Sequence, residues 1–339
     1  MSRIEILDKK TIDSIAAGEV VERPASVAKE LVENSIDSGA KNITVEIKNG
    51  GKSLLRVTDN GCGIPGDQVK LAFLRHATSK LKNIDELSHI SSLGFRGEAL
   101  SSISAVSQVE LITRTGDQIA GTRYVIEGGV EKAFDQVGAP YGTTFIMKNL
   151  FFNTPAREKF LKSALTEGNA VVSYMEQLAL SHPDISFNFI SDGRQKIFTS
   201  GSGDLKECIY RIYGREITKQ LIEIDRSSGP VSIYGFIGRP EISRGNRNFE
   251  NYFVNGRYVK NNIISSALEE AYRGHLMQHR YPFTLLNITT DPEKVDVNVH
   301  PAKMEVRFSD QREIFDSVRD IIESALMKNE EVPSIPASD

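Results

Sequence analysis

The feature that most constrains the fold is a glycine-rich loop that directly follows a β-hairpin. The stretch "NITVEIKNGG" alternates apolar and polar residues and then turns, and "SLLRVTDN" predicts a second strand beside it. The loop after it, "GCGIPG", has the glycine spacing of a dinucleotide-binding loop. Such a loop joins the first strand of a parallel sheet to a helix, and an acid ends the next strand about 20 residues on. The acid at that distance, Glu86, has no strand before it, so the sequence argues against a Rossmann fold.

Asp59 ends the predicted second strand on the same face as Leu55 and Val57. A carboxylate on a buried face needs a partner, because an unpaired buried charge is costly. One partner is the amino group of a flat ring, which Gly61 and Gly63 would allow to approach the backbone. The alternative is a turn in which the Asp59 side chain caps its own backbone. The residues alone leave both interpretations open.

The segment "PASVAKELVENSID" predicts a helix over residues 24–37, because Pro24 suits a first turn and Gly39 suits a stop. Its expected apolar face comprises Val27, Ala28, Leu31, Val32 and Ile36, with Lys29 and Glu33 opposite as an exposed pair. Glu30 and Asn34 lie on the border between the two faces. A half-buried carboxylate there can hold a water and take its proton, and an amide oxygen can bind Mg²⁺. An ordinary amphipathic border accounts for the same two residues.

Two further segments favour a phosphate site. "SLGFRGEALSSI" places Gly94 and Gly97 before a predicted helix, where backbone N–H groups and the helix dipole attract anions. "RHATSK" adds Thr78, Ser79 and Lys80. Ordinary loop structure is the alternative for each segment. The chain contains no GxxxxGK[ST], which excludes a P-loop ATPase.

The rest of the chain predicts an α/β protein with two domains. Strands are expected between 108 and 150 and helices between 158 and 181, and the loose texture near 199–204 indicates a domain boundary. The second part predicts helices at 205–213, 262–273 and 311–327 and strands near 230–236, 250–254, 283–289 and 295–299. The last segment, 331–339, has the composition of a linker.

Composition narrows the class of protein. The chain has 339 residues, of which 40% are hydrophobic and 25% charged, with a formal net charge of -4, typical of a globular protein. Cys62 and Cys208 are the two cysteines, which excludes a disulfide framework and a cysteine-rich zinc site. No signal peptide or membrane-spanning run is expected, so a cytoplasmic protein without a membrane partner is predicted.

Four segments in chain order carry a family resemblance. "KELVENSIDSGA", "DNGCGI", "SLGFRGEAL" and "GTTFIMKNLFFNTPAR" resemble the nucleotide-binding motifs of the GHKL ATPases, which include gyrase B, Hsp90 and sensor histidine kinases. Together with "RHATSK" and "VDVNVHPAKMEVRF", they are similar to the MutL family of mismatch-repair ATPases, from Ile15 to about Phe308. The resemblance implies a two-layer α/β sandwich of the GHKL (Bergerat) type over 1–202, with a lid at about 72–100. It also implies a smaller α/β transducer domain with left-handed βαβ character over 203–330, then the start of a linker over 331–339.

The resemblance also assigns roles to residues. Glu30 becomes the general base, Asn34 the protein ligand to Mg²⁺, and Asp59 the acceptor for the adenine amino group of ATP. Gly61, Gly63 and Thr143 would shape the adenine site, and Lys303 would reach the γ-phosphate as a second catalytic residue. The expected phosphate-facing residues are Thr78, Ser79, Lys80, Gly94, Phe95, Arg96, Gly97, Glu98, Ala99 and Leu100.

The implied function is that of a mismatch-repair matchmaker with slow, Mg²⁺-dependent ATP hydrolysis. ATP would drive formation of a homodimer that engages a MutS-type mismatch sensor and a downstream endonuclease, helicase or clamp. Non-sequence-specific, salt-sensitive DNA binding would use Arg244, Arg247, Arg257, Lys260 and Arg273, although Asn261 and Asn262 stand where some relatives carry further basic residues. In a bacterium the protein would be cytoplasmic and associated with the nucleoid. The alternative is a DNA-binding scaffold with a vestigial nucleotide site, and no nuclease activity is expected of this chain.

Overall fold

The computed structural model describes residues 17–18, 20–75, 77, 97–296 and 306–330. The chain divides into two compact units, Met1–Asp204 and Leu205–Asp339, whereas the sequence places the boundary after residue 202. No helix in the described ranges is both long enough and apolar enough to cross a membrane.

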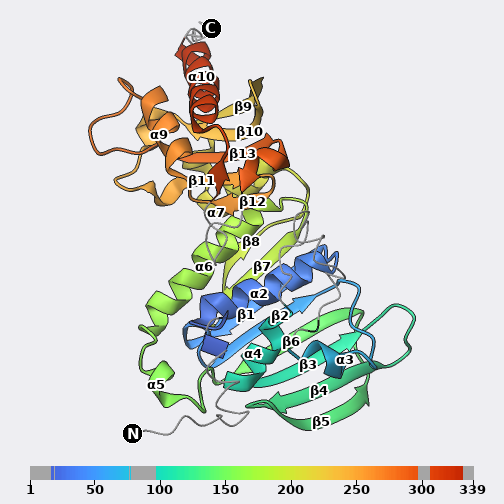
Figure 1. The fold of residues 1–339 in the computed structure, drawn as a ribbon. Coiled ribbons are helices and arrows are strands. Elements are labelled where there is room, and N and C mark those ends of the chain that lie inside the picture. The colour runs from blue at the N-terminus through green and yellow to red at the C-terminus, as the bar shows by residue number, and fades with distance from the viewer. Residues whose placement is uncertain (1–16, 19, 76, 78–96, 297–305, 331–339) are drawn as a thin grey trace, which may run out of the picture. The chain divides into compact units, whose positions relative to one another are not determined.

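The first unit is built on an eight-stranded sheet (Figure 1). Its spatial order is β5 (Val130–Val137), β4 (Gly121–Glu127), β3 (Gln108–Arg114), β6 (Gly142–Lys148), β2 (Leu54–Asp59), β1 (Asn42–Lys48), β7 (Ser186–Ser191) and β8 (Arg194–Phe198). Neighbouring strands run antiparallel except β1 and β7, which are parallel. The expected hairpin is confirmed as β1 and β2, with Ile43 opposite Asp59 and Val45 opposite Val57.

The helices of this unit are α2 (Pro24–Asp37), α3 (Val69–Ala72), α4 (Ala99–Val106), α5 (Pro155–Glu158) and α6 (Ala164–Ser181). The longer ones, α2, α4 and α6, pack on the sheet and on each other (Figure 1). Along β2, Leu55 and Val57 are buried, whereas Arg56 is exposed and pairs with Glu46 of β1. One face of these strands is therefore covered and the other carries charge, as the expected two-layer sandwich requires.

The predicted bounds of α2 are confirmed, since the helix runs from Pro24 to Asp37 and Gly39 follows at φ +77. The region 158–181 forms α6 and the end of α5, because Ser163 caps a new helix by accepting a hydrogen bond from Thr166 N at 3.2 Å.

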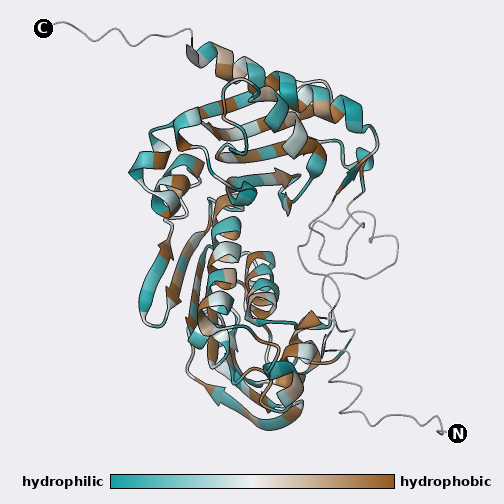
Figure 2. Cartoon of the chain, turned by 90° about the vertical axis from the view of Figure 1, so that its left-hand side faces the viewer, coloured by the Kyte–Doolittle hydropathy of each residue, from teal (hydrophilic) through white to brown (hydrophobic). Residues whose placement is uncertain are grey.

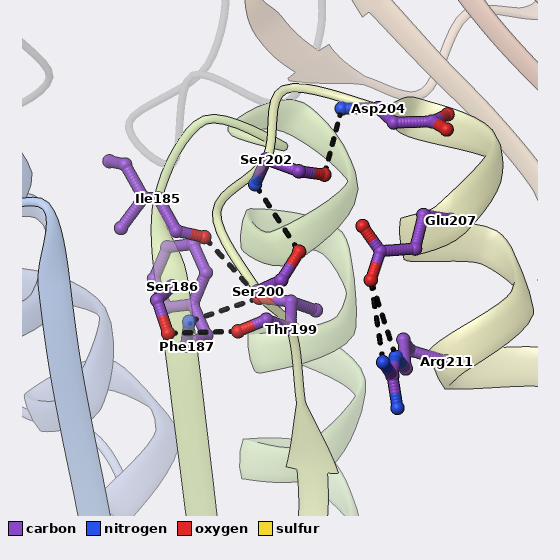
Figure 3. A network of polar contacts seen from close by, with 9 residues as sticks. All are labelled: Ile185, Ser186, Phe187, Thr199, Ser200, Ser202, Asp204, Glu207 and Arg211. Atoms are coloured by element: carbon purple, nitrogen blue, oxygen red, sulfur yellow. Dashed lines mark hydrogen bonds and ion pairs between the residues drawn. The ribbon is translucent and has the colours of Figure 1, made fainter.

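The chain leaves the first unit through serine-capped turns (Figure 3). Thr199 Oγ1 accepts a hydrogen bond from Phe187 N at 3.0 Å, which fixes the end of β8 against β7. Ser200 Oγ then accepts from Ser202 N, and Ser202 Oγ accepts from Asp204 N. Side chains therefore accept from two of the backbone N–H groups of this segment, and the carbonyl oxygen of Pro183 accepts from Gly203 N at 2.9 Å.

The second unit contains a five-stranded sheet (Figure 1). Its order is β12 (Arg257–Val259), β11 (Glu250–Val254), β13 (Thr284–Thr290), β10 (Val231–Gly238) and β9 (Leu221–Ser228). Two-residue strands β14 (Val295–Asp296) and β15 (Arg307–Phe308) pair beside it. The helices are α7 (Leu205–Tyr213), α8 (Arg215–Thr218), α9 (Asn262–Ala271) and α10 (Gln311–Glu330).

The core of the second unit lies where α9 and α10 cover the sheet. Figure 2 shows hydrophobic and hydrophilic residues interleaved along α10, and its buried residues Val318, Ile321 and Ile322 share one cluster with Ile233 of β10 and Leu268 of α9. Parallel β11 and β13 are joined through α9, which is a βαβ arrangement. The left-handed character expected of it stays a prediction.

Candidate functional site

Helix α2 presents Glu30 and Asn34 one turn apart. Its apolar residues Val27, Ala28, Leu31 and Val32 are buried, while Glu30 and Asn34 are half-buried, as the sequence predicts. The Glu30 carboxylate forms no hydrogen bond within the described part of the chain. Both of its oxygens are therefore available to a water molecule that an attacking step would use.

The expectation for Glu33 is wrong. The residue is 8% exposed instead of solvated, because α6 packs along that side of α2 and Tyr174 of α6 donates a hydrogen bond to Glu33 Oε1 at 2.9 Å. Burial raises the pKa of the Tyr174 hydroxyl well above its usual value, with smaller contributions from Glu33 and Glu30. The phenol is therefore a permanent donor beside both carboxylates. Ile36, expected on the buried face, is half-buried.

Asp59 lies at the end of β2, opposite Thr143 of β6. Its Oδ1 accepts hydrogen bonds from Gly61 N at 2.9 Å and from Thr143 N at 3.2 Å. Its Oδ2 accepts from the hydroxyl of Ser35, on α2, at 2.8 Å. Burial raises the pKa of the Asp59 carboxyl, and the bonds from Gly61, Ser35 and Thr143 oppose that rise. The turn cap is therefore present in the structure, and acceptance of a ring amino group by the half-buried carboxylate stays a prediction.

The glycines of the loop allow protein segments to approach one another. A Cβ at Gly61 would lie 1.8 Å from Ser38 Oγ, at the end of α2. Gly63 has φ +74, and a Cβ there would lie 2.4 Å from the carbonyl oxygen of Arg114, at the end of β3. The loop is therefore held between α2 and β3, and in the described residues these glycines accommodate protein atoms.

The sequence reasoning missed three residues around Asp59. Ser35 is 4% exposed and bonds directly to the carboxylate. The Thr113 hydroxyl accepts from Ile64 N at 2.9 Å and lies 3.0 Å from the Thr143 hydroxyl, which ties the loop to β3 and β6. Gly142 has φ +107 and lets β6 approach Asp59. A glycine directly before "TT" was a usable signal, whereas nothing local marks Ser35 or Thr113.

The predicted helix after Gly97 is confirmed as α4. Gly97 adopts φ +62, Glu98 precedes the helix, and residues 97–100 are half-buried. The first turn of α4 has backbone N–H groups without helical partners, which suits an anion. Thr78, Ser79, Lys80, Gly94, Phe95, Arg96 and Lys303 lie outside the described residues.

The five basic candidates for DNA binding lie in the second unit. Arg247 is exposed but pairs with Glu269 of α9, its Nε lying 2.6 Å from Oε1, and Arg273 pairs with Glu270. The Arg244 guanidinium lies 5.0 Å from the centre of the Phe249 ring. Arg257 is half-buried in β12 and Lys260 is exposed. Asn261 is a structural residue, since its side chain caps α9 at Ile263 N and Ile264 N.

The donor set fits Mg²⁺ held mainly by a nucleotide. Among the described residues, no group of three or more His, Cys, Asp or Glu side chains could hold a metal by itself. Mg²⁺ keeps waters and phosphate oxygens and needs only one or two protein oxygens, which the amide of Asn34 can supply. Asp59 is linked to the same helix, because it accepts a hydrogen bond from Ser35, the residue after Asn34.

Two known families match separate parts of the chain. The family described as "Histidine kinase-, DNA gyrase B-, and HSP90-like ATPase" matches residues 22–136, which include α2, Asp59 and the glycine loop. The family described as "DNA mismatch repair protein, C-terminal domain" matches residues 209–327.

Two similar proteins, both named "DNA mismatch repair protein MutL", align along nearly the whole chain. The protein from Agathobacter rectalis is 59% identical over 336 residues, covering 99% of this chain and 52% of the relative. The one from Caldanaerobacter subterraneus subsp. tengcongensis is 46% identical over 335 residues, covering 99% and 57%. The chain therefore spans about half the length of the curated relatives it matches.

Solved structures match the fold as well. "Crystal Structure of N terminal domain of a DNA repair protein" aligns with a TM-score of 0.80 over 95% of this chain and 100% of that one, at 23% identity. "Aquifex aeolicus MutL ATPase domain complexed with ADP" aligns with a TM-score of 0.62 over 80% and 94%, at 29% identity.

Proposed function

This chain belongs to the MutL family of DNA mismatch repair proteins, and we propose that it binds ATP at Asp59 and hydrolyses it slowly to ADP and phosphate. The single observation that carries the proposal is the hydrogen bond from Ser35 to Asp59. It joins the helix of Glu30 and Asn34 to the carboxylate that would accept the adenine amino group. The ADP complex of the related Aquifex aeolicus domain supports the same ligand class for this chain.

The chemistry follows from the side chains. Glu30 would take a proton from the attacking water while the water oxygen bonds to the γ-phosphorus and ADP leaves with the electrons of the broken P–O bond. Backbone N–H groups at the start of α4, between Gly97 and Leu100, would bind phosphate oxygens. Asn34 would hold Mg²⁺, which when bound neutralises charge on those oxygens. The roles of Lys303 and of the expected phosphate-facing residues from Thr78 to Arg96 stay predictions.

The proposed function includes a change of state that ATP controls. ATP but not ADP would bring two copies of the first unit together, and the dimer would act as a matchmaker between a MutS-type mismatch sensor and a downstream endonuclease, helicase or clamp. The five basic residues of the second unit would contact DNA phosphates without reading sequence. For Arg247 and Arg273 this contact must compete with Glu269 and Glu270. The proposed location is the bacterial cytoplasm, at the nucleoid.

Replacing Glu30 tests the proposed reaction. Glu30→Ala removes the general base, so hydrolysis should fall by about 10²–10⁴-fold while ATP still binds. Phosphate release and equilibrium binding of ATP measure the two effects. Glu22→Ala, an exposed glutamate just before α2, is the matched control and should hydrolyse ATP normally. Unchanged turnover in Glu30→Ala would contradict the assigned role.

Equilibrium binding of DNA separates the alternative function. A scaffold with a vestigial nucleotide site would bind DNA equally with and without a non-hydrolysable ATP analogue. An ATP-gated matchmaker would bind DNA differently in the two states, and its binding would weaken steeply with salt.

A further inference from the structure

We propose that Ser35 is a positioning residue that selects the nucleobase: its hydroxyl fixes Asp59 as a pure hydrogen-bond acceptor, so the site takes a purine with a 6-amino group over one with a 6-carbonyl. The inference rests on the proposed ATP site and goes beyond it, because it assigns base selection to a residue that need not touch the base.

The hydrogen bonds of Asp59 all run in one direction. Gly61 N and Thr143 N donate to Oδ1 at 2.9 and 3.2 Å, and the Ser35 hydroxyl donates to Oδ2 at 2.8 Å. The donors come from three different elements: the glycine loop, β6 and α2. An ionised carboxylate offers about four acceptor positions, so one position, on Oδ2, is left for an incoming N–H.

The Ser35 hydroxyl has a single proton and two acceptors within reach. Its oxygen lies 2.8 Å from Asp59 Oδ2 and 3.2 Å from the carbonyl oxygen of Leu31, one turn back on α2. A hydrogen bond to a charged oxygen is shorter and stronger than one to a neutral carbonyl. The Ser35 hydroxyl therefore donates its proton to Asp59. Because Ser35 is 4% exposed, water cannot readily take the place of this hydroxyl in a variant that lacks it.

Ser35 matters for the charge on Asp59 as well as for its position. Burial raises the pKa of this carboxyl, and the Ser35 bond is one of three that oppose the rise. Without the hydroxyl one of these three opposing bonds is lost, which raises the pKa of Asp59 further. The ionised carboxylate repels the lone pairs of a 6-carbonyl oxygen, whereas the O–H of a protonated carboxyl can donate to that oxygen. Loss of Ser35 should thus relax base selection as well as weaken adenine binding.

The test compares ADP with inosine diphosphate, which carries a carbonyl in place of the 6-amino group and is not hydrolysed. Calorimetric titration of the intact chain gives both affinities. Ser35→Ala should reduce the preference for ADP over inosine diphosphate by about tenfold, the size expected for a hydrogen bond to a charged group. The matched control is Ser104→Ala on α4, a buried serine whose hydroxyl donates only to the Ser101 carbonyl, and it should keep the wild-type ratio.

Two further variants fix the interpretation. Asp59→Asn replaces one acceptor oxygen with a donor, so it should favour inosine diphosphate, and adding Ser35→Ala to it should leave that ratio unchanged. Ser35→Cys keeps a similar shape with a weaker donor and should reduce the ratio less than alanine, which keeps the test decisive if the alanine variant does not fold. A wild-type ratio in folded Ser35→Ala or Ser35→Cys overturns the inference. Failure of the wild-type chain to bind ADP at all would instead overturn the proposed ATP site.

Discussion

Glu250 is the first residue of β11 in the second unit, and it is only 6% exposed. The Tyr252 hydroxyl donates to its Oε2 at 2.8 Å, while Oε1 is buried without a hydrogen-bond partner in the described residues. Burial raises the pKa of Glu250 from 4.5 to about 7, and the bond from Tyr252 opposes that rise. Glu269 raises this pKa further, while Arg247 and Ser265 lower it.

This pKa makes the stability of the second unit depend on pH. Between pH 4.5 and about 7 the folded unit holds a proton that the unfolded chain has released, so stability falls as pH rises through that window. The full effect is about 3 kcal/mol, at about 1.4 kcal/mol per unit of pKa. Hydrogen exchange of β11, corrected for intrinsic rates, should show this loss between pH 5 and pH 8.

Glu250→Gln should remove that dependence and stabilise β11 above pH 7, because its neutral amide needs no proton. The exposed Glu216 provides a control, since Glu216→Gln should leave the pH dependence of β11 in place. A β11 stability that stays constant from pH 5 to pH 8 in the wild-type chain would contradict the raised pKa.

The burial of single site residues could be predicted where strand or helix periodicity fixes the face on which they lie. Strand parity places Asp59 on the buried face with Leu55 and Val57, and helical spacing places Glu30 and Asn34 on the border of α2. Glu33 was not predictable, because a helical wheel counts only the apolar face and does not show that α6 brings the Tyr174 hydroxyl to it. A polar contact between two helices does not appear in the hydrophobic periodicity of either sequence.

At the scale of elements, α2 is held against α6 by polar contacts at two places. Before its first turn, Arg23 donates to Oε2 of Glu167, which is 2% exposed, and Lys162 N donates to the other oxygen of that carboxylate. Near its middle, Glu33 accepts from Tyr174. Since α2 carries both Glu30 and Asn34, these contacts determine how the proposed catalytic helix lies on its neighbour.

Removing the Tyr174 hydroxyl should loosen this packing. Tyr174→Phe leaves the buried Glu33 carboxylate without one of its donors, which costs about 1–3 kcal/mol. Hydrogen exchange of α2 and α6 should rise accordingly. Tyr210→Phe, at an exposed tyrosine of α7, should leave exchange in both helices unchanged. Equal protection of α2 in wild type and Tyr174→Phe would show that the hydrogen bond contributes nothing.

Elements whose ends are marked by capping or turn residues could be predicted from the sequence, whereas pairings between distant strands could not. Pro24 and Gly39 mark the ends of α2, and the turn after "NITVEIK" marks the β1–β2 hairpin. The parallel pairing of β1 with β7 joins Asn42 to Ser186, and no local feature of either segment specifies a partner that far along the chain. The strands β7 and β8 were therefore missed even though the Asp192-Gly193 turn lies between them.

At the scale of the whole molecule, the proposed switch is an association of two chains. With Mg²⁺ and a non-hydrolysable ATP analogue, light scattering should show a dimer, and with ADP a monomer, because only the triphosphate offers a γ-phosphate to bind. Asn34→Ala should stay monomeric with the analogue, since its Mg²⁺-dependent nucleotide binding is lost. Glu30→Ala should dimerise with ATP itself, because ATP persists. A molecular mass that is unaffected by nucleotide would contradict the switch.

The sequence predicted two α/β units and a family, but not the local architecture that connects them. The resemblance covers both units because long motifs such as "KELVENSIDSGA" and "VDVNVHPAKMEVRF" are specific without reference to packing. The turns after β8 were not predictable in this way. The hydrogen bonds that the Ser200 and Ser202 hydroxyls accept there depend on turn geometry, which a polar composition does not define.

Gly142 shows how tolerance to mutation is distributed in this protein. A methyl group at this position would lie 2.1 Å from the Asp59 carbonyl oxygen and would force the ends of β2 and β6 apart. The smallest possible side chain would thus displace Asp59 from its partner strand while leaving every polar side chain around it unchanged. A change in the proposed nucleotide site can therefore arise at a residue without a functional group, and a survey restricted to ligand-contacting side chains would pass over it.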